Sequence, residues 1–218
     1  FYVTFPGSLH FYLSYALEDS EGPARDILEK MEEDINLDSL GVRGMAWSEL
    51  MLSHALVGNV DRADGMFQAY ENDVPSEQRG QQYRINSVSL EAFGALGTRD
   101  YASAASAFDV LGTEVLSCGS VCKEHALWGI ALEGAGHTEE AVTQYEAHLT
   151  GGPLSWHPVL TPWTPTVMER LARLYAEQGD VERAIEVLES LVAQYSDGDG
   201  PFLAYVDRAE RRLAELRE

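Results

Sequence analysis

The 34 residues from 165 to 198 constrain the fold more than any other stretch of this chain. They contain two apolar stripes with helical spacing, the first of which runs from Met168 to Tyr175. Between the stripes stand Gly179, which tolerates the left-handed backbone that ends a helix, and Asp180, which can cap the next helix. The stretch therefore predicts a hairpin of two amphipathic helices. The second stripe consists of Val181, Ala184, Ile185, Leu188, Leu191 and Val192.

Such a hairpin implies neighbours of the same kind, because neither helix can bury its apolar face alone. The small residue where the two helices cross is Ala184, and equivalent alanines occur at spacings of 39, 41, 37 and 43 residues. We therefore expect five hairpins and a polar-faced capping helix over residues 201–217. The alanines are Ala24, Ala63, Ala104, Ala141 and Ala184, and the expected hairpins cover residues 5–38, 44–77, 85–118, 122–155 and 165–198.

The sequence predicts an all-α fold, an α-solenoid, because alternating apolar runs bounded by turns are absent. Two segments depart from regular repeats. The first helix of the third hairpin carries Gly94 and Gly97, each of which costs about 1 kcal/mol relative to alanine, so we expect a short or frayed helix. Residues 151–165 contain four prolines and two tryptophans, which favours a long loop over a regular helix.

The length, spacing and residue types resemble those of the tetratricopeptide repeat family, most closely over residues 44–77 and 165–198. The resemblance implies a right-handed superhelix that binds peptides or partner proteins on its concave face, without catalysis of its own. It also implies which residues of the first helices line that groove. Carried over position by position, these are Met45, Ser48, Leu52, Asn86, Ser89, Phe93, Lys123, Ala126, Ile130 and Arg173.

A narrower resemblance is to the C-terminal repeat region of bacterial serine/threonine kinases and transcriptional regulators. It rests on the order of a cysteine pair, a repeat, a proline-rich loop, a final repeat and a basic-tinged helix. The alternative function that it implies is a sensory or regulatory segment. The chain begins at Phe1 rather than at methionine and contains no kinase motif, so we interpret it as a fragment whose catalytic domain, if any, lies outside it.

The charge balance restricts the class of partner. The chain has 36 Asp and Glu against 15 Lys and Arg, a net charge of -21, which disfavours nucleic acid and anionic membrane surfaces. We expect a protein or peptide partner of apolar or basic character. Because no run of 18 apolar residues occurs, we expect no membrane insertion by this segment. It is then soluble, either in the cytoplasm or as the extracytoplasmic part of a membrane-anchored bacterial protein.

The remaining candidates for chemistry are few. Cys118 and Cys122 can be two free thiols or a small-loop disulfide, and the sequence leaves both open. Three residues of the proline-rich segment are candidates for a binding loop: Trp156, His157 and Trp163. His54, His125 and His148 fall on apolar helix faces, where a buried structural role is expected. No phosphate loop, nucleophile elbow or zinc helix occurs, so we expect neither an enzyme nor a cofactor or metal.

Overall fold

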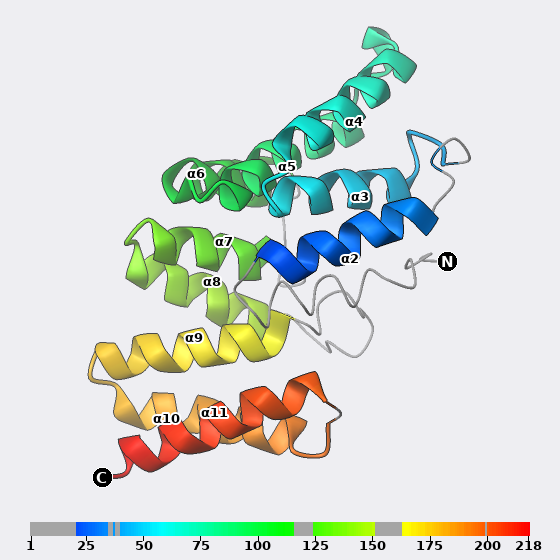
Figure 1. Cartoon of the computed structure of the whole chain (residues 1–218). Helices are drawn as coiled ribbons and strands as arrows, with labels where there is room; N and C mark the ends of the chain where they lie inside the picture. Colours follow the sequence, from blue (N-terminus) through cyan, green and yellow to red (C-terminus); the bar gives the residue numbers. More distant parts are fainter. Residues whose placement is uncertain (1–20, 35–36, 38–39, 116–123, 151–162, 199) are drawn as a thin grey trace.

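The computed structural model describes residues 21–34, 37, 40–115, 124–150, 163–198 and 200–218. Within these ranges the chain forms ten α-helices and no strand, which confirms the predicted all-α fold (Figure 1). A short 3-10 helix, Ser76–Gln78, follows α4, and a π-helical turn, Leu111–Val115, follows α6. The helices are α2 (Glu21–Asp34), α3 (Met45–Leu56), α4 (Val60–Asp73), α5 (Gln81–Gly97), α6 (Tyr101–Val110), α7 (Glu124–Gly134), α8 (Thr138–Thr150), α9 (Trp163–Glu177), α10 (Val181–Tyr195) and α11 (Pro201–Leu216).

The helices from α3 to α10 pair into four hairpins whose turns share one geometry. In each turn a backbone N–H donates to the carbonyl five residues earlier, and the residue before the donor has a positive φ. This arrangement satisfies carbonyls that would otherwise be left unpaired at the end of the first helix. The donors are Asn59, Asp100, His137 and Asp180, at 2.8–2.9 Å, and the residues with positive φ are Gly58, Arg99, Gly136 and Gly179.

The hairpins stack along the molecule as a solenoid, from α3–α4 at the top of Figure 1 to α10 with the terminal helix α11 at the bottom. The five alanines that mark the repeat are all completely buried, as expected for residues at helix crossings. Most of the buried apolar side chains form one core cluster that extends from α2 to α10. A second cluster joins α9, α10 and α11, so the terminal helix covers the end of the stack.

The way in which neighbouring hairpins pack changes once along the stack. Helices α7, α9 and α11 pack mainly against the second helix of the hairpin before them, α6, α8 and α10. Helix α5 instead packs mainly against α3, the first helix of the preceding hairpin, and much less against α4. The α3–α4 hairpin is therefore joined to the α5–α6 hairpin mainly through α3 and α5, and α4 contacts α5 less extensively.

The expectation of a short or frayed first helix in the third hairpin is wrong. Helix α5 has 17 residues and includes both glycines. The physical reason is that Gly97 lies against the backbone of the α3 turn. A Cβ atom at this position would come within 2.7 Å of the Leu56 carbonyl oxygen and 2.8 Å of the Gly58 nitrogen. The missing side chain allows α3 and α5 to approach, and the packing offsets the low helix propensity of glycine.

The predicted loop over residues 151–165 is wrong at its last three residues, which are helical. Helix α9 begins at Trp163, and Pro165 lies in its first turn, where a missing N–H donor leaves no helical hydrogen bond unmade. Trp163 is 2% exposed and belongs to the core. Residues 151–162 lie outside the described part of the chain. Among the helices of the described residues, none is both long and apolar enough to span a bilayer.

Candidate functional site

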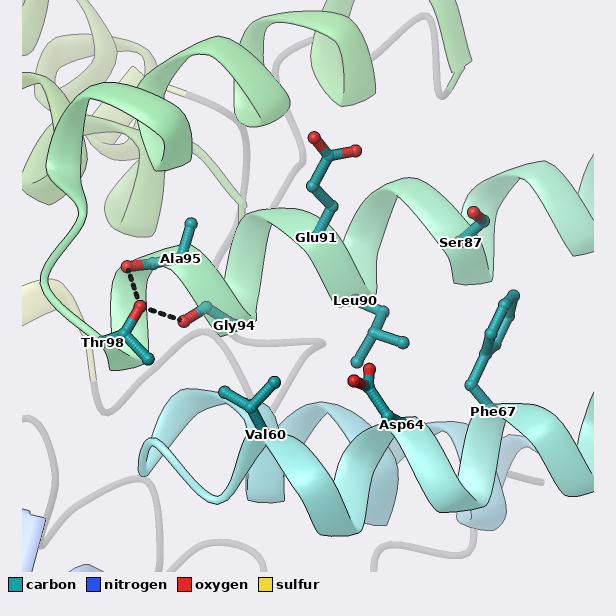
Figure 2. Close-up of a pocket in the computed structure, with 9 residues that line it drawn as sticks. All are labelled: Val60, Asp64, Phe67, Ser87, Leu90, Glu91, Gly94, Ala95 and Thr98. Atoms are coloured by element: carbon teal, nitrogen blue, oxygen red, sulfur yellow. Dashed lines mark hydrogen bonds between the residues drawn. The ribbon is translucent and has the colours of Figure 1, made fainter.

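A cleft of about 380 Å³ lies between α4 and α5, and side chains of both helices line it (Figure 2). Its volume falls toward the lower end of the range for ligand pockets, about 300–1,000 Å³. Val60, Asp64 and Phe67 rise from α4 toward α5, and Leu90 reaches down from α5 toward α4. The other lining residues all belong to α5 or directly follow it: Ser87, Glu91, Gly94, Ala95 and Thr98.

The cleft is open because of two features of α5. Gly94 has no side chain, and a Cβ atom built on it would meet only Val60 Cγ2, at 4.0 Å. One helical turn later, Gly97 holds α5 against α3 rather than against α4. At that end the Thr98 hydroxyl donates to the carbonyl oxygens of Gly94 and Ala95, at 2.9 and 3.2 Å. Val60, Leu90 and the Gly94 backbone give the cleft an apolar floor. The last turn of α5 is fixed by its own hydrogen bonds.

Two carboxylates accompany this apolar floor. Asp64 points into the cleft from α4, and Glu91 stands on the α5 side, directed away from α4 (Figure 2). Both side chains are exposed, and among the described residues neither has an ion-pair or hydrogen-bond partner. Arg62, two residues before Asp64 on α4, is engaged elsewhere in an ion pair with Glu32 of α2. The cleft thus combines an apolar floor with uncompensated negative charge.

The predicted groove residues are distributed between the core and the surface of the first helices. Asn86, Ser89 and Phe93 of α5 are buried, and the Phe93 ring lies 5.7 Å from the ring of Phe108. Ala126 of α7 is also completely buried. The partly exposed members are Ser48 and Leu52 on α3 and Ile130 on α7. Met45 begins α3, its side chain lies outside the described set, and Lys123 lies outside the described residues altogether.

The remaining groove candidate, Arg173, belongs to an ion-pair network between two hairpins. It donates to Glu133 of α7 at 2.6 Å and to Glu177 of its own helix at 2.8 Å. Glu133 also accepts from Arg170 of α9, at 2.9 Å, and from the Tyr145 hydroxyl of α8, at 2.8 Å. Sequence reasoning missed this network, because Glu133 and its partners are connected only through the stacking of α7, α8 and α9.

The other predicted candidates are not brought together by the described structure. Trp156, His157, Cys118 and Cys122 lie outside the described residues, so the binding loop and the state of the cysteine pair stay predictions. Among the residues that the structure describes, no group of three or more His, Cys, Asp or Glu side chains is placed to hold a metal ion.

The three histidines predicted to be structural lie between helices. His54 is 1% exposed, with Nδ1 3.4 Å from the Asn59 amide and Nε2 3.2 Å from a Glu32 carboxylate oxygen. Burial nevertheless lowers the pKa of His54, and the nearby Glu32 only partly opposes this effect. His125 Nδ1 lies 2.7 Å from Gln144 Oε1, and His148 Nε2 lies 3.3 Å from the Thr164 hydroxyl. These imidazoles join α3 to α2, α7 to α8, and α8 to α9.

His148 predicts a pH dependence of stability. Burial lowers its pKa to about 4, with a smaller effect from nearby His125, whereas an unfolded histidine has a pKa of about 6.5. The unfolded chain therefore binds more protons between these values, so stability present above pH 6.5 is lost as pH falls toward 4, by up to about 3 kcal/mol. The free energy of unfolding in urea, measured at several pH values from 7 to 4, should decrease less for His148→Gln than for the wild type. The control is His137→Gln, because the His137 side chain is 58% exposed. Parallel curves of unfolding free energy against pH for the wild type and His148→Gln would contradict the prediction.

Comparison with known proteins identifies one repeat directly. A family model described as tetratricopeptide repeat matches residues 166–198, which cover α10 and all but the first three residues of α9, so the chain contains a tetratricopeptide repeat where the sequence predicted its last hairpin. No curated protein matches the chain. A structure of a MamA mutant is 17% identical over 84% of this chain and 94% of that chain, with a TM-score of 0.44. A structure of MamA MSR-1 is 16% identical over 94% of this chain and 97% of that chain, with a TM-score of 0.42.

Proposed function

We propose that this tetratricopeptide-repeat chain is a non-catalytic scaffold that binds a protein or peptide along the face formed by the first helices of its hairpins. The observation that carries the proposal is the stack itself, in which α3, α5, α7 and α9 belong to successive hairpins of one solenoid. A stack of this kind presents one extended surface built from equivalent positions, which suits an extended or helical partner.

The buried groove candidates support that face from beneath. Phe93 and Ala126 pack in the core cluster, so the proposed contact surface consists of the partly exposed residues Ser48, Leu52 and Ile130 together with Arg173. The two apolar side chains provide the area that a partner can bury. The Arg173 guanidinium adds a charge whose position is fixed by Glu133 and Glu177.

The groups with the largest pKa changes support a structural role. Burial raises the pKa of Tyr145 well above its ordinary value, and its hydroxyl donates to Glu133 between α8 and α7. His148 is 3% exposed and lies against Thr164. Both groups hold helices together, and neither lines the α4–α5 cleft.

Affinity capture with partner identification by mass spectrometry tests the proposal. We expect the double variant Leu52→Asn and Ile130→Asn to recover a wild-type partner at least about tenfold less well, because central apolar contacts dominate binding energy. The control is Val181→Asn with Leu203→Asn, which changes two apolar side chains that are 39% and 41% exposed on α10 and α11. Far-ultraviolet circular dichroism must show equal helix content in both variants. Equal recovery by the groove variant and the control argues against the proposed face.

A further inference from the structure

We propose that the cleft between α4 and α5 binds an arginine side chain presented by a basic, partly apolar segment of a partner protein. The inference rests on the proposed function only in that a partner supplies the segment, because the cleft is a different surface. Ser87, Glu91 and Gly94 follow one stripe of α5, and the groove candidates Asn86, Ser89 and Phe93 follow another. The chain would then contact its partner at two places.

The shape of the cleft suits the stem of a long side chain. Val60, Leu90 and the Gly94 backbone form an apolar floor, of which Leu90 is only 9% exposed. The three methylenes of an arginine can lie along such a floor while the charged end stays near solvent. A volume of about 380 Å³ leaves room for that side chain and part of an adjacent apolar residue.

The charge of the cleft selects a cation. Asp64 lies where a guanidinium in the cleft could reach it, Glu91 adds negative charge on the α5 side, and neither is paired by another described residue. A purely apolar occupant would remove water from Asp64 without replacing the lost hydrogen bonds, and an acidic occupant would be repelled. Guanidinium is preferred to ammonium because its planar donor fork matches a carboxylate.

An aromatic wall at one end strengthens the preference for arginine. The Phe67 ring lines the cleft, and it lies 6.0 Å from the ring of Tyr70 and 5.6 Å from that of Tyr83. A guanidinium next to such a ring gains a cation–π interaction. The protein uses the same pairing internally, since Arg183 lies over the Tyr175 ring at 4.3 Å and Arg208 over the Tyr205 ring at 4.5 Å.

The test titrates the whole chain with N-acetyl-leucyl-arginine amide, a probe small enough for the cleft. Binding is followed by the backbone amide chemical shifts of the protein in NMR spectra. We expect saturable shifts for residues 60–67 and 87–98, with a Kd of about 1 mM, as suits so small a ligand. The citrulline analogue, which has the same shape without the charge, should bind at least about fivefold more weakly. Shifts spread over the acidic surface that vanish with salt, or equal binding of the citrulline analogue, overturn the proposal.

Two sets of variants locate the site. Gly94→Leu fills the cleft and should abolish the shifts, whereas Gly65→Leu places the same side chain on the exposed face of α4, where nothing lies within 4 Å, and should leave them intact. Asp64→Asn with Glu91→Gln changes only exposed groups, so this pair tests the charge without endangering the fold. Retained binding in either cleft variant overturns the proposal.

The Leu52→Asn and Ile130→Asn variant should bind the probe normally, so failure at the cleft and failure of the first-helix face are distinguishable.

Discussion

Replacing Gly97 with alanine should destabilise the protein by about 3 kcal/mol or more, because the new methyl group would overlap backbone atoms at the end of α3. These atoms can move away only if α3 itself shifts. The Cβ atom would lie 2.7 Å from the Leu56 carbonyl oxygen and closer still to that of Ala55. Relief requires α3 and α5 to separate at the place where the α3–α4 and α5–α6 hairpins are joined. For a chain of this size, we expect the midpoint of thermal unfolding to fall by about 6–12 °C.

The matched control is Gly94→Ala in the same helix, three residues earlier. Its Cβ atom would meet only Val60 Cγ2 at 4.0 Å, so the gain in helix propensity of about 1 kcal/mol should be realised. The two substitutions are chemically identical and have opposite expected signs. Circular dichroism with urea and with heat measures both, and a Gly97→Ala variant as stable as the wild type would mean that α3 and α5 are not in close contact.

The fold could be predicted from the sequence wherever it depends on local pattern. The stripe spacing, the turn residues and the recurring alanines are properties of single hairpins, and these predictions are confirmed by the helices, by turns such as that at Gly179 and Asp180, and by the burial of Ala63 and Ala184. Helix α5 could not be predicted in this way. Glycine propensity measures the cost in an isolated helix, whereas the benefit of Gly97 comes from α3, more than 40 positions earlier.

The candidate sites show the same limit more strongly. The resemblance identified first-helix positions, but the exposure of each depends on its neighbours, so Phe93 is buried against Phe108 while Leu52 is partly exposed. Asp64 and Glu91 belong to different hairpins and share no motif. The cleft beside them exists because α5 packs mainly against α3 and less against α4, which no periodicity in the sequence records.

Replacing Tyr145 with alanine should destabilise the protein by about 3–5 kcal/mol, the usual cost of removing a large aromatic side chain from a core. Tyr145 is completely buried in α8, and its ring occupies the space left by Gly129 of α7, whose Cβ atom would lie 2.5 Å from Tyr145 Cδ1. Its hydroxyl also donates to Glu133 at 2.8 Å. Tyr145→Phe keeps the ring and removes only that hydrogen bond to a charged group, so it should cost about 1.5–3 kcal/mol.

A double-mutant cycle separates the shape of this contact from its hydrogen bond. Gly129→Ala alone should be destabilising, because the methyl group overlaps the Tyr145 ring. In the Tyr145→Ala background the same methyl group enters the vacated space, so it should cost less than in the wild type and can become stabilising. Urea unfolding monitored by circular dichroism gives all four free energies. Additive effects would contradict a direct contact between Gly129 and the Tyr145 ring, and equal stabilities of Tyr145→Ala and Tyr145→Phe would place the whole contribution of this residue in the hydroxyl.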